Sequence, residues 1–349
     1  MDNYDESIIE IALLSASIKS KIANFEEVLR IVLTGGDLSD NEHMSEFKKY
    51  GLDDAFWKHI NQTFSFVDDE PNLEKLVISL FLTYTEKEIS CELPSSYNKY
   101  LLSKSGTVMA FMDQIMNSVI YRNEFDILSD KVFIKINGRK LFMDFSVEDI
   151  VNLEIFRFVD EKIIHWIIER LLDENLNSTI DGMDIPRLCK FREKKYFGKD
   201  YVYEYHALKH AFYIINQVNY KAESDIVSII EKYVREDYRI DTHYRKFYYY
   251  LDKINNQHIF DNLKELVENI YTNKFLDVIT KEFNDKFSYE DLRGKYKLQR
   301  DFYNNYIDGI KEKMVVIISD AFRYEVAKEL VKTLDKNKKM DMVDIGSQI

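Results

Sequence analysis

Turn-forming residues are scarce in this chain, and their scarcity limits the folds open to it. Only 10 glycines and 3 prolines occur among 349 residues. Glycine and proline mark most tight turns and interrupt helices. Apolar residues recur at helical spacing over long stretches, beginning with residues 8–32. We therefore expect a mainly α-helical protein with long helices and few turns.

The periodicity divides the chain into three parts. Residues 1–174 form a first helical region. Residues 175–310 form a second, entered by a long irregular loop that contains Gly182, Pro186 and Gly198. Residues 311–349 follow a different pattern. Within the first region, two alternating apolar runs flank Asn137-Gly138, which predicts a small β-hairpin near residues 132–145.

The change of pattern after residue 310 predicts the start of an α/β domain. Residues 314–318 are continuously apolar, as in a buried parallel strand. Residues 321–335 then carry apolar side chains on one helical face, and residues 340–345 read as a second strand. The expected fold is thus a large helical region with a small hairpin, followed by the first βαβ unit of another domain.

Asp320 lies at the end of the predicted strand, where open α/β sheets bind their ligands. Two roles remain open for it: a metal ligand or catalytic acid, and the N-cap of the helix that follows. Arg323 and Glu325 lie on the first turn of that helix. They either orient a substrate or the site, or belong to a solvated helix face. Ser319 has no visible base partner, so we do not assign it as a nucleophile.

Charge and cysteine content exclude several classes of function. The formal net charge of -13 disfavours indiscriminate binding to nucleic acid or to anionic membranes. No apolar run reaches the roughly 18 residues of a membrane span. The acidic N-terminus lacks a signal-peptide pattern. Cys91 and Cys189 form neither a disulfide framework nor a zinc motif. We expect a cytoplasmic protein that binds no membrane.

Two further patterns allow a functional and a structural interpretation. His206 and His210 are spaced like a metal-binding pair, but residues 207–209 lack the glutamate of the metalloprotease motif, which favours ordinary core or surface histidines. Residues 233–250 interleave tyrosine with arginine, a pattern that suits single-stranded nucleic acid. Intervening acids favour tyrosine packing and arginine–carboxylate pairs instead.

The string Ile318-Ser319-Asp320-Ala321-Phe322-Arg323-Tyr324-Glu325, with the valines before it, resembles the opening of the PglZ domain. PglZ proteins are components of BREX-type phage-defence systems. Four stretches upstream resemble the helical region that precedes this domain, in the expected order: residues 25–29 with Gly35-Gly36, 76–85, 240–245 and 299–303.

The resemblance implies an alkaline-phosphatase-like domain and a metal-dependent phosphatase or phosphodiesterase. In that superfamily an Asp at the end of the first strand binds a divalent metal, usually zinc, and Asp320 matches that position. A Thr or Ser nucleophile and further Asp and His ligands follow later. Ser347 is not in the matching context, so the nucleophile is not assigned to it.

We expect from the resemblance that the chain is truncated at the C-terminus and also at the N-terminus, where the family carries a further domain. The fragment alone should hold no metal stably and should be inactive. Its partners would be other BREX proteins. The alternative is a non-catalytic helical scaffold that binds those partners; a single-stranded nucleic-acid binder is a weaker third hypothesis.

Overall fold

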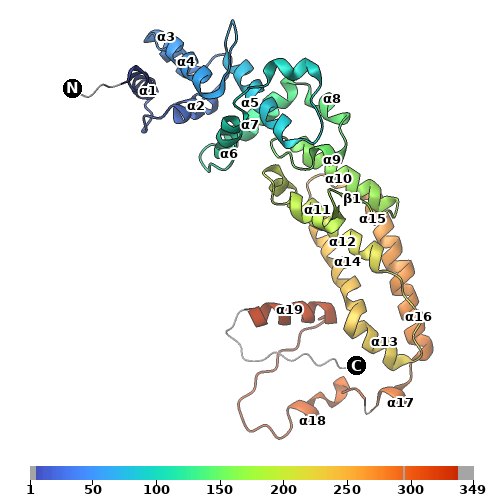
Figure 1. Ribbon diagram of the computed structural model, residues 1–349. Coiled ribbons are helices and arrows are strands. Elements are labelled where there is room, and N and C mark those ends of the chain that lie inside the picture. The colour runs from blue at the N-terminus through green and yellow to red at the C-terminus, as the bar shows by residue number, and fades with distance from the viewer. Residues whose placement is uncertain (1–4, 294, 337–349) are drawn as a thin grey trace. The chain divides into compact units, whose positions relative to one another are not determined.

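The computed structural model describes residues 5–293 and 295–336, which are mainly helical (Figure 1). They divide into two compact units. The first comprises the described residues up to Ile164 together with Phe191–Tyr201, and the second comprises His165–Lys190 and the described residues from Val202 onward. No helix in the described part combines the length and the apolar character of a membrane span.

The first unit is built almost entirely from short helices. They are α1 (Glu6–Ser17), α2 (Phe25–Thr34), α3 (Glu42–Lys49), α4 (Asp53–Phe64), α5 (Leu73–Glu88), α6 (Ser105–Met116), α7 (Arg122–Lys135), α8 (Gly138–Met143), α9 (Val147–Ile150) and the beginning of α10 (Arg157–Leu172), with 3-10 turns at Ser95–Tyr100 and Phe197–Tyr201.

Side-chain caps and a phenylalanine core explain why these helices form. Asn24, Asn41 and Asn72 each accept a hydrogen bond from an amide in the first turn of the helix that follows. The core of the unit includes a group of buried phenylalanine rings whose centroids lie 5.6–5.7 Å apart, namely Phe81, Phe125, Phe142 and Phe156. Aromatic pairs at this spacing add stability beyond their buried area.

A fully buried ion pair joins the chain segments of this unit. Asp160 on α10 and Arg192 on α11 (Ile185–Arg192) both have side chains that are 0% exposed. The guanidinium donates to both oxygens of Asp160 at 2.8–2.9 Å and to the carbonyls of Val151 and Leu153. Gly198 fits beside it because a Cβ there would lie 1.8 Å from the Arg192 carbonyl oxygen.

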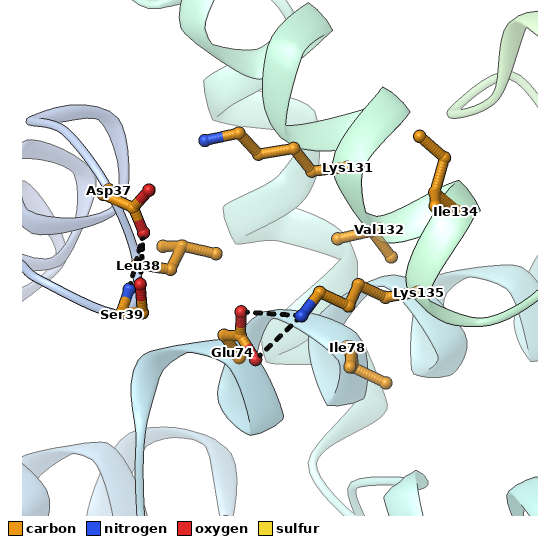
Figure 2. Close-up of a pocket in the computed structure, with 9 residues that line it drawn as sticks. All are labelled: Asp37, Leu38, Ser39, Glu74, Ile78, Lys131, Val132, Ile134 and Lys135. Carbon is orange, nitrogen blue, oxygen red and sulfur yellow. Dashed lines mark hydrogen bonds and ion pairs between the residues drawn. The ribbon is translucent and has the colours of Figure 1, made fainter.

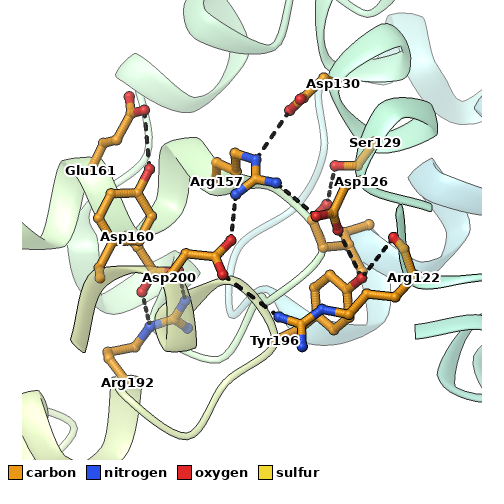
Figure 3. A network of polar contacts seen from close by, with 12 residues as sticks. Arg122, Asp126, Ser129, Asp130, Arg157, Asp160, Glu161, Arg192, Tyr196 and Asp200 are labelled. Atoms are coloured by element: carbon orange, nitrogen blue, oxygen red, sulfur yellow. Dashed lines mark hydrogen bonds and ion pairs between the residues drawn. The ribbon is translucent and has the colours of Figure 1, made fainter. Parts of the chain in front are cut away.

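A second, more exposed polar network surrounds this pair (Figure 3). Arg157 pairs with Asp126 at 2.8 Å and with Asp200, and its guanidinium lies 4.4 Å from the ring centre of Phe197. Tyr196 donates its hydroxyl proton to Asp126 at 2.8 Å. The network fixes the returning segment Phe191–Tyr201 against α7 and α10.

The predicted hairpin near residues 132–145 is wrong, because α7 and α8 occupy this segment. Phe125, Leu128, Val132 and Ile136 are buried at helical spacing. A short apolar run does not distinguish a strand from a buried helix by periodicity alone. Asn137 ends α7 in the left-handed region at φ 52°, and Gly138 begins α8, where a Cβ would meet the ring of Phe133 at 2.3 Å.

The described residues do contain a hairpin, but it lies within the segment predicted as a loop. Strands β1 (Thr179–Ile180) and β2 (Met183–Asp184) pair antiparallel around Asp181-Gly182. Both turn residues have positive φ, 48° and 69°. That is the requirement of a type I′ turn, which Asp-Gly meets readily. The rest of the predicted entry loop contains α11 and a 3-10 turn.

The second unit is also helical, and its helices are labelled in Figure 1. They are the end of α10, most of α11, α12 (Val202–Gln217), α13 (Ile226–Lys232), α14 (Tyr238–Leu251), α15 (Asp261–Asn269), α16 (Asp277–Lys286), α17 (Tyr289–Leu292), α18 (Phe302–Tyr306) and α19 (Tyr324–Lys336), with π-helical turns at Tyr233–Asp237 and Ile270–Leu276 and 3-10 turns at Gln257–Phe260 and Gln299–Asp301. Helices α12 and α14 pack along each other.

The predicted βαβ unit is not present in the described residues. Residues 314–318 form no strand, and Val315, Ile317 and Ile318 are 85–91% exposed. A parallel strand needs hydrogen-bonded neighbours, and none of the described segments pairs with this one. The predicted helix is present as α19, although it begins at Tyr324 instead of residue 321. The predicted second strand, residues 340–345, lies outside the described residues.

We predict that Arg192→Met strongly destabilises the first unit. The substitution leaves the Asp160 carboxyl group buried and without its bidentate partner, which typically lowers the free energy of unfolding by about 3–5 kcal/mol. Urea denaturation followed by circular dichroism measures this change. Arg187→Met is the matched control, because Arg187 lies on the same helix but is 74% exposed, 3.8 Å from Asp184. Equal stability of the two variants would contradict the role of the buried pair.

Candidate functional site

Asp320 lies in an exposed turn between the apolar run and α19. Its Oδ1 accepts a hydrogen bond from the amide of Ala321 at 2.9 Å. The helix starts four residues further on, so Asp320 is not at the N-cap position that the alternative reading gave it. Ala321 has a left-handed backbone with φ 53°. That conformation costs an L-residue about 1–2 kcal/mol.

Glu325 lies five residues after Asp320 and is not on a solvated face. Its side chain is 0% exposed, and both of its oxygens accept hydrogen bonds from Arg245 of α14 at 2.9–3.1 Å. Bidentate arginine–carboxylate pairs of this kind are among the stronger polar contacts in proteins. The hydrogen bonds with Glu325 raise the pKa of Arg245 above its ordinary value.

A second acid extends this contact by one helical turn. Glu329 accepts a hydrogen bond from Arg245 at 2.7 Å and one from Lys246 at 2.5 Å. Burial opposes ionisation of Glu329, but the hydrogen bonds from Lys246 and Arg245 prevail and lower its pKa. Two consecutive turns of α19 therefore present carboxylates to two adjacent cations of α14.

Asp241 lies one turn before Arg245 on α14 and faces the same region. Tyr233 and Tyr271 both donate their hydroxyl protons to its carboxylate, the second at 2.8 Å. Burial raises the pKa of Asp241, while those hydrogen bonds and the positive charge of Arg323 oppose the rise. Arg323 is itself exposed. Of the two residues predicted to orient a site, Glu325 is thus held against α14, and Arg323 lies near Asp241.

The structure does not bring Asp320 together with other metal-ligand side chains. Among the described residues, no group of three or more His, Cys, Asp or Glu side chains is arranged to hold a metal ion. The structure instead brings the turn at residues 320–325 next to residues 240–245 of α14. Arg245, the partner of Glu325, was not predicted as a site residue. The sequence favoured arginine–carboxylate pairs in residues 233–250, but it does not show that the acid lies 80 residues away.

Comparison with known proteins finds two distant relatives. The chain is 26% identical over 348 residues to the alkaline phosphatase-like protein PglZ of Bacillus cereus (strain H3081.97), covering 96% of this chain. It is 25% identical over 377 residues to the alkaline phosphatase-like protein BrxZ of Escherichia coli O9:H4 (strain HS), covering 100% of this chain. The chain is a distant homologue of the PglZ/BrxZ alkaline phosphatase-like proteins.

The chain spans only part of the length of its relatives, 40% of PglZ and 43% of BrxZ. No family model matches it, and no solved structure matches it. The sequence resemblance is therefore confirmed as distant homology. This distant homology does not by itself assign the activity of the relatives to this chain.

His206 and His210, the histidines with the spacing of a metal-binding pair, both make structural contacts in this chain. His210 on α12 is buried, and its Nδ1 lies 2.8 Å from Nδ1 of His243 on α14. The ring of His210 stacks on Tyr250, and the ring of His243 stacks on Tyr213. One nitrogen of the pair donates and the other accepts, and burial lowers the pKa of both rings, which keeps both neutral near pH 7. His206 stacks on Tyr250 at 4.7 Å.

The tyrosines of residues 233–250 mainly pack and donate to acids. Tyr244 and Tyr248 both donate their hydroxyl protons to Glu268, and Tyr244 stacks on Tyr271 at 3.6 Å. A carboxylate beside each hydroxyl repels the phosphate groups that a nucleic-acid groove must attract. The geometry therefore favours the packing interpretation of this stretch.

The first unit carries a pocket of about 320 Å³ (Figure 2). Its lining combines Ile78 of α5 and Val132 of α7 with two lysines of α7, Lys131 and Lys135. Lys135 pairs with Glu74 at 3.0 Å. Asp37, across the opening, accepts hydrogen bonds from the backbone and hydroxyl of Ser39, which lower its pKa. Glu74 and Asp37 are therefore already paired, and the residues that line the pocket form no catalytic arrangement.

We predict that the His210–His243 pair makes the second unit acid-labile. Burial is the main cause that lowers the pKa of His210 to about 2 and that of His243 to about 4. Both values lie below 6.5, so the unfolded chain binds protons first as the pH falls. The contribution of the two histidines to the free energy of unfolding is therefore complete above about pH 6.5. It decreases toward pH 4, by up to about 1.4 kcal/mol per pH unit for each histidine.

Thermal melts between pH 4 and pH 7.5 measure this dependence. A His210→Phe, His243→Leu double variant should show a shallower decline below pH 6.5. His258→Gln is the control, because His258 is 92% exposed and its replacement should leave the slope unchanged. A double variant with the wild-type slope would show that other groups cause the acid lability.

Proposed function

We propose that this chain is the helical region and the first part of the hydrolase domain of a BREX-type phage-defence protein. The complete protein would act as a metal-dependent phosphatase or phosphodiesterase. The observation that carries the proposal is distant homology, over nearly the whole chain, to two proteins named alkaline phosphatase-like. In this proposal residues 1–174 and 175–310 are the helical regions, and residues 311–349 begin the alkaline-phosphatase-like domain.

Asp320 is the proposed ligand of a divalent metal, with zinc favoured by the family. Its carboxylate is exposed, and only its Oδ1 accepts a hydrogen bond from the described residues. A catalytic zinc takes about three protein ligands. The described residues supply one of them, so they do not fit a complete site, and the other ligands would come from outside them. A bound metal would activate the nucleophile and stabilise charge on the phosphate.

The exposed apolar surface around Asp320 supports the α/β assignment of residues 311–349. Val315, Ile317 and Ile318 expose most of their side chains, and Phe322 and Leu330 are each 45% exposed. Such a contiguous apolar segment suits burial in a parallel sheet, with α19 packed on one face. Residues 314–318 would then be the first strand, and Asp320 would stand at its carboxyl end.

We predict that Asp320→Asn abolishes metal-dependent hydrolysis in the protein made from the complete reading frame. Removing a ligand charge should lower the rate of hydrolysis of bis(p-nitrophenyl) phosphate at limiting zinc or manganese by about 100-fold or more. Asp335→Asn is the matched control, since Asp335 is an exposed acid on α19. Full activity in Asp320→Asn, or hydrolysis that does not respond to metal and chelator, would contradict the proposal.

A non-catalytic scaffold that binds other BREX proteins is the second candidate. It is favoured by exposed apolar side chains in the first unit: Val119 and Ile120, in the turn before α7, are 96% and 78% exposed, and Ile134, near the end of α7, is 77% exposed. Exposed apolar side chains on a helical surface suit protein partners. A Val119→Ser, Ile120→Ser, Ile134→Ser variant tests it by co-elution with each of the other BREX proteins. Unchanged co-elution with every partner would exclude this surface.

A further inference from the structure

We propose that the outward face of α1 is a docking site for a basic amphipathic helix of another protein. The face consists of Ile8, Ile9, Ala12, Leu13 and Ala16, and it lies entirely within the first unit. The inference goes beyond the proposed function, since it depends on neither hydrolysis nor a metal ion.

The first step is that this face is both apolar and exposed. Ile8, Ile9 and Leu13 are 56%, 49% and 50% exposed, and Ala12 and Ala16 are exposed as well. Residues three and four apart are neighbours on a helix surface, so the five side chains form one continuous stripe. The outward face of a surface helix normally carries polar side chains. A contiguous apolar stripe in that place indicates an interaction surface.

The second step is that α1 cannot turn this stripe inward. Its opposite face is already in use, because Leu14 and Ile18 are only 0% and 9% exposed. Glu10 lies one turn before Leu14, and its carboxylate is 2.9 Å from both Lys58 Nζ and His59 Nε2 of α4. Rotation of α1 would expose Leu14 and break both contacts. Burial of the stripe therefore requires a separate partner.

The third step is that the stripe has the shape of a helix-packing surface. The large side chains of Ile8, Ile9 and Leu13 alternate with the small ones of Ala12 and Ala16. Helices pack by fitting ridges of side chains into grooves, with axes about 8–10 Å apart. The 12 residues of α1 span about 18 Å, which is the length of a partner helix of three turns. The surface therefore fits a helix.

The fourth step is that acidic side chains flank both ends of the stripe. Asp5 and Glu6 are exposed at the N-terminal end of α1. Three acids line a pocket beside its C-terminal end, together with residues 17–19 of the chain, namely Asp40, Glu42 and Glu46. Lys19 offsets one of these charges. The surroundings of the stripe are thus mainly negative.

This charge selects the partner. Over residues 5–60, 11 Asp and Glu outnumber 6 Lys and Arg, even with Lys19 and Lys21 counted. Lysine or arginine beside the apolar face of a partner helix would pair with the acids while that face covers the stripe. A second copy of this chain would bring like charges together, and nucleic acid or an anionic membrane would be repelled. The occupant is therefore a basic amphipathic helix.

Binding of a model helix to the whole chain tests the inference. The probe is a fluorescein-labelled leucine–lysine peptide of about 14 residues, or four helical turns, with amphipathic spacing. Its counterpart carries glutamate in place of every lysine. In fluorescence polarisation at physiological ionic strength, we expect the lysine peptide to bind and the glutamate peptide not to bind. Hydrogen–deuterium exchange should show that the bound lysine peptide protects α1.

Variants of the stripe locate the binding. Ile9→Gln with Leu13→Gln removes apolar surface while glutamine keeps a high helix propensity, and it should weaken binding of the lysine peptide by about 10-fold or more. Ile127→Gln with Ile134→Gln is the matched control, because these residues are 56% and 77% exposed on α7 of the same unit. The control should bind like the parent chain. Circular dichroism melts of both variants verify that the fold is kept.

A second pair of variants tests the charge of the surroundings. Asp5→Asn with Glu6→Gln should weaken binding several-fold and reduce its dependence on salt. Asparagine is as good an N-cap as aspartate, so α1 should remain formed. Asp69→Asn with Glu70→Gln makes the same charge change at exposed acids before α5, and it should have a smaller effect.

Three results would each overturn the inference. They are no binding of the lysine peptide, equal binding of the two peptides, and an Ile9→Gln, Leu13→Gln variant that binds as tightly as the parent chain. Sedimentation velocity adds a fourth. A dimer of the parent chain that this variant loses would assign the face to a second copy instead of a basic helix.

Discussion

The salt bridge between Arg245 and Glu325 is the interaction on which the arrangement of the candidate site depends. Through this salt bridge, α14 contacts α19, the helix that follows the Asp320 turn. α19 leaves part of its apolar edge exposed. Its contact with α14 is made by two acids facing two cations, together with the edge-on contact between Tyr324 and Tyr238.

Hydrogen bonds to carboxylates are also frequent in the rest of the protein. With a net charge of -13, the chain has too few lysines and arginines to pair every acid. Tyrosine hydroxyls supply further donors: Tyr196 to Asp126 in the first unit, and Tyr271 to Asp241 and Tyr248 to Glu268 in the second. Such bonds let an acidic chain place carboxylates beside aromatic rings without a cation for each. The high tyrosine content thus has a structural explanation that needs no nucleic acid.

The sequence predicted the helical class because periodic apolar spacing and few glycines act over many residues. The prediction from sequence was wrong where a short apolar segment is compatible with both a strand and a helix. The apolar run before Asn137-Gly138 reads as strand or buried helix, and Phe133 packing on Phe142 decides for helix. Asp181-Gly182 was the better turn signal, but its flanking strands are only two residues each. Asp320 was found as a candidate from its place after an apolar run. Arg245 was not, because a tertiary pair has no local pattern.

The most direct test of this account is a crystal structure of the protein made from the complete reading frame, grown with zinc and measured at the zinc absorption edge. The account predicts an anomalous peak about 2.0–2.2 Å from an Asp320 carboxylate oxygen, while Glu325 remains paired with Arg245. A zinc site built without Asp320 would contradict the metal assignment. Zinc bound at Asp320 with Glu325 detached from Arg245 would contradict the contact between α19 and α14.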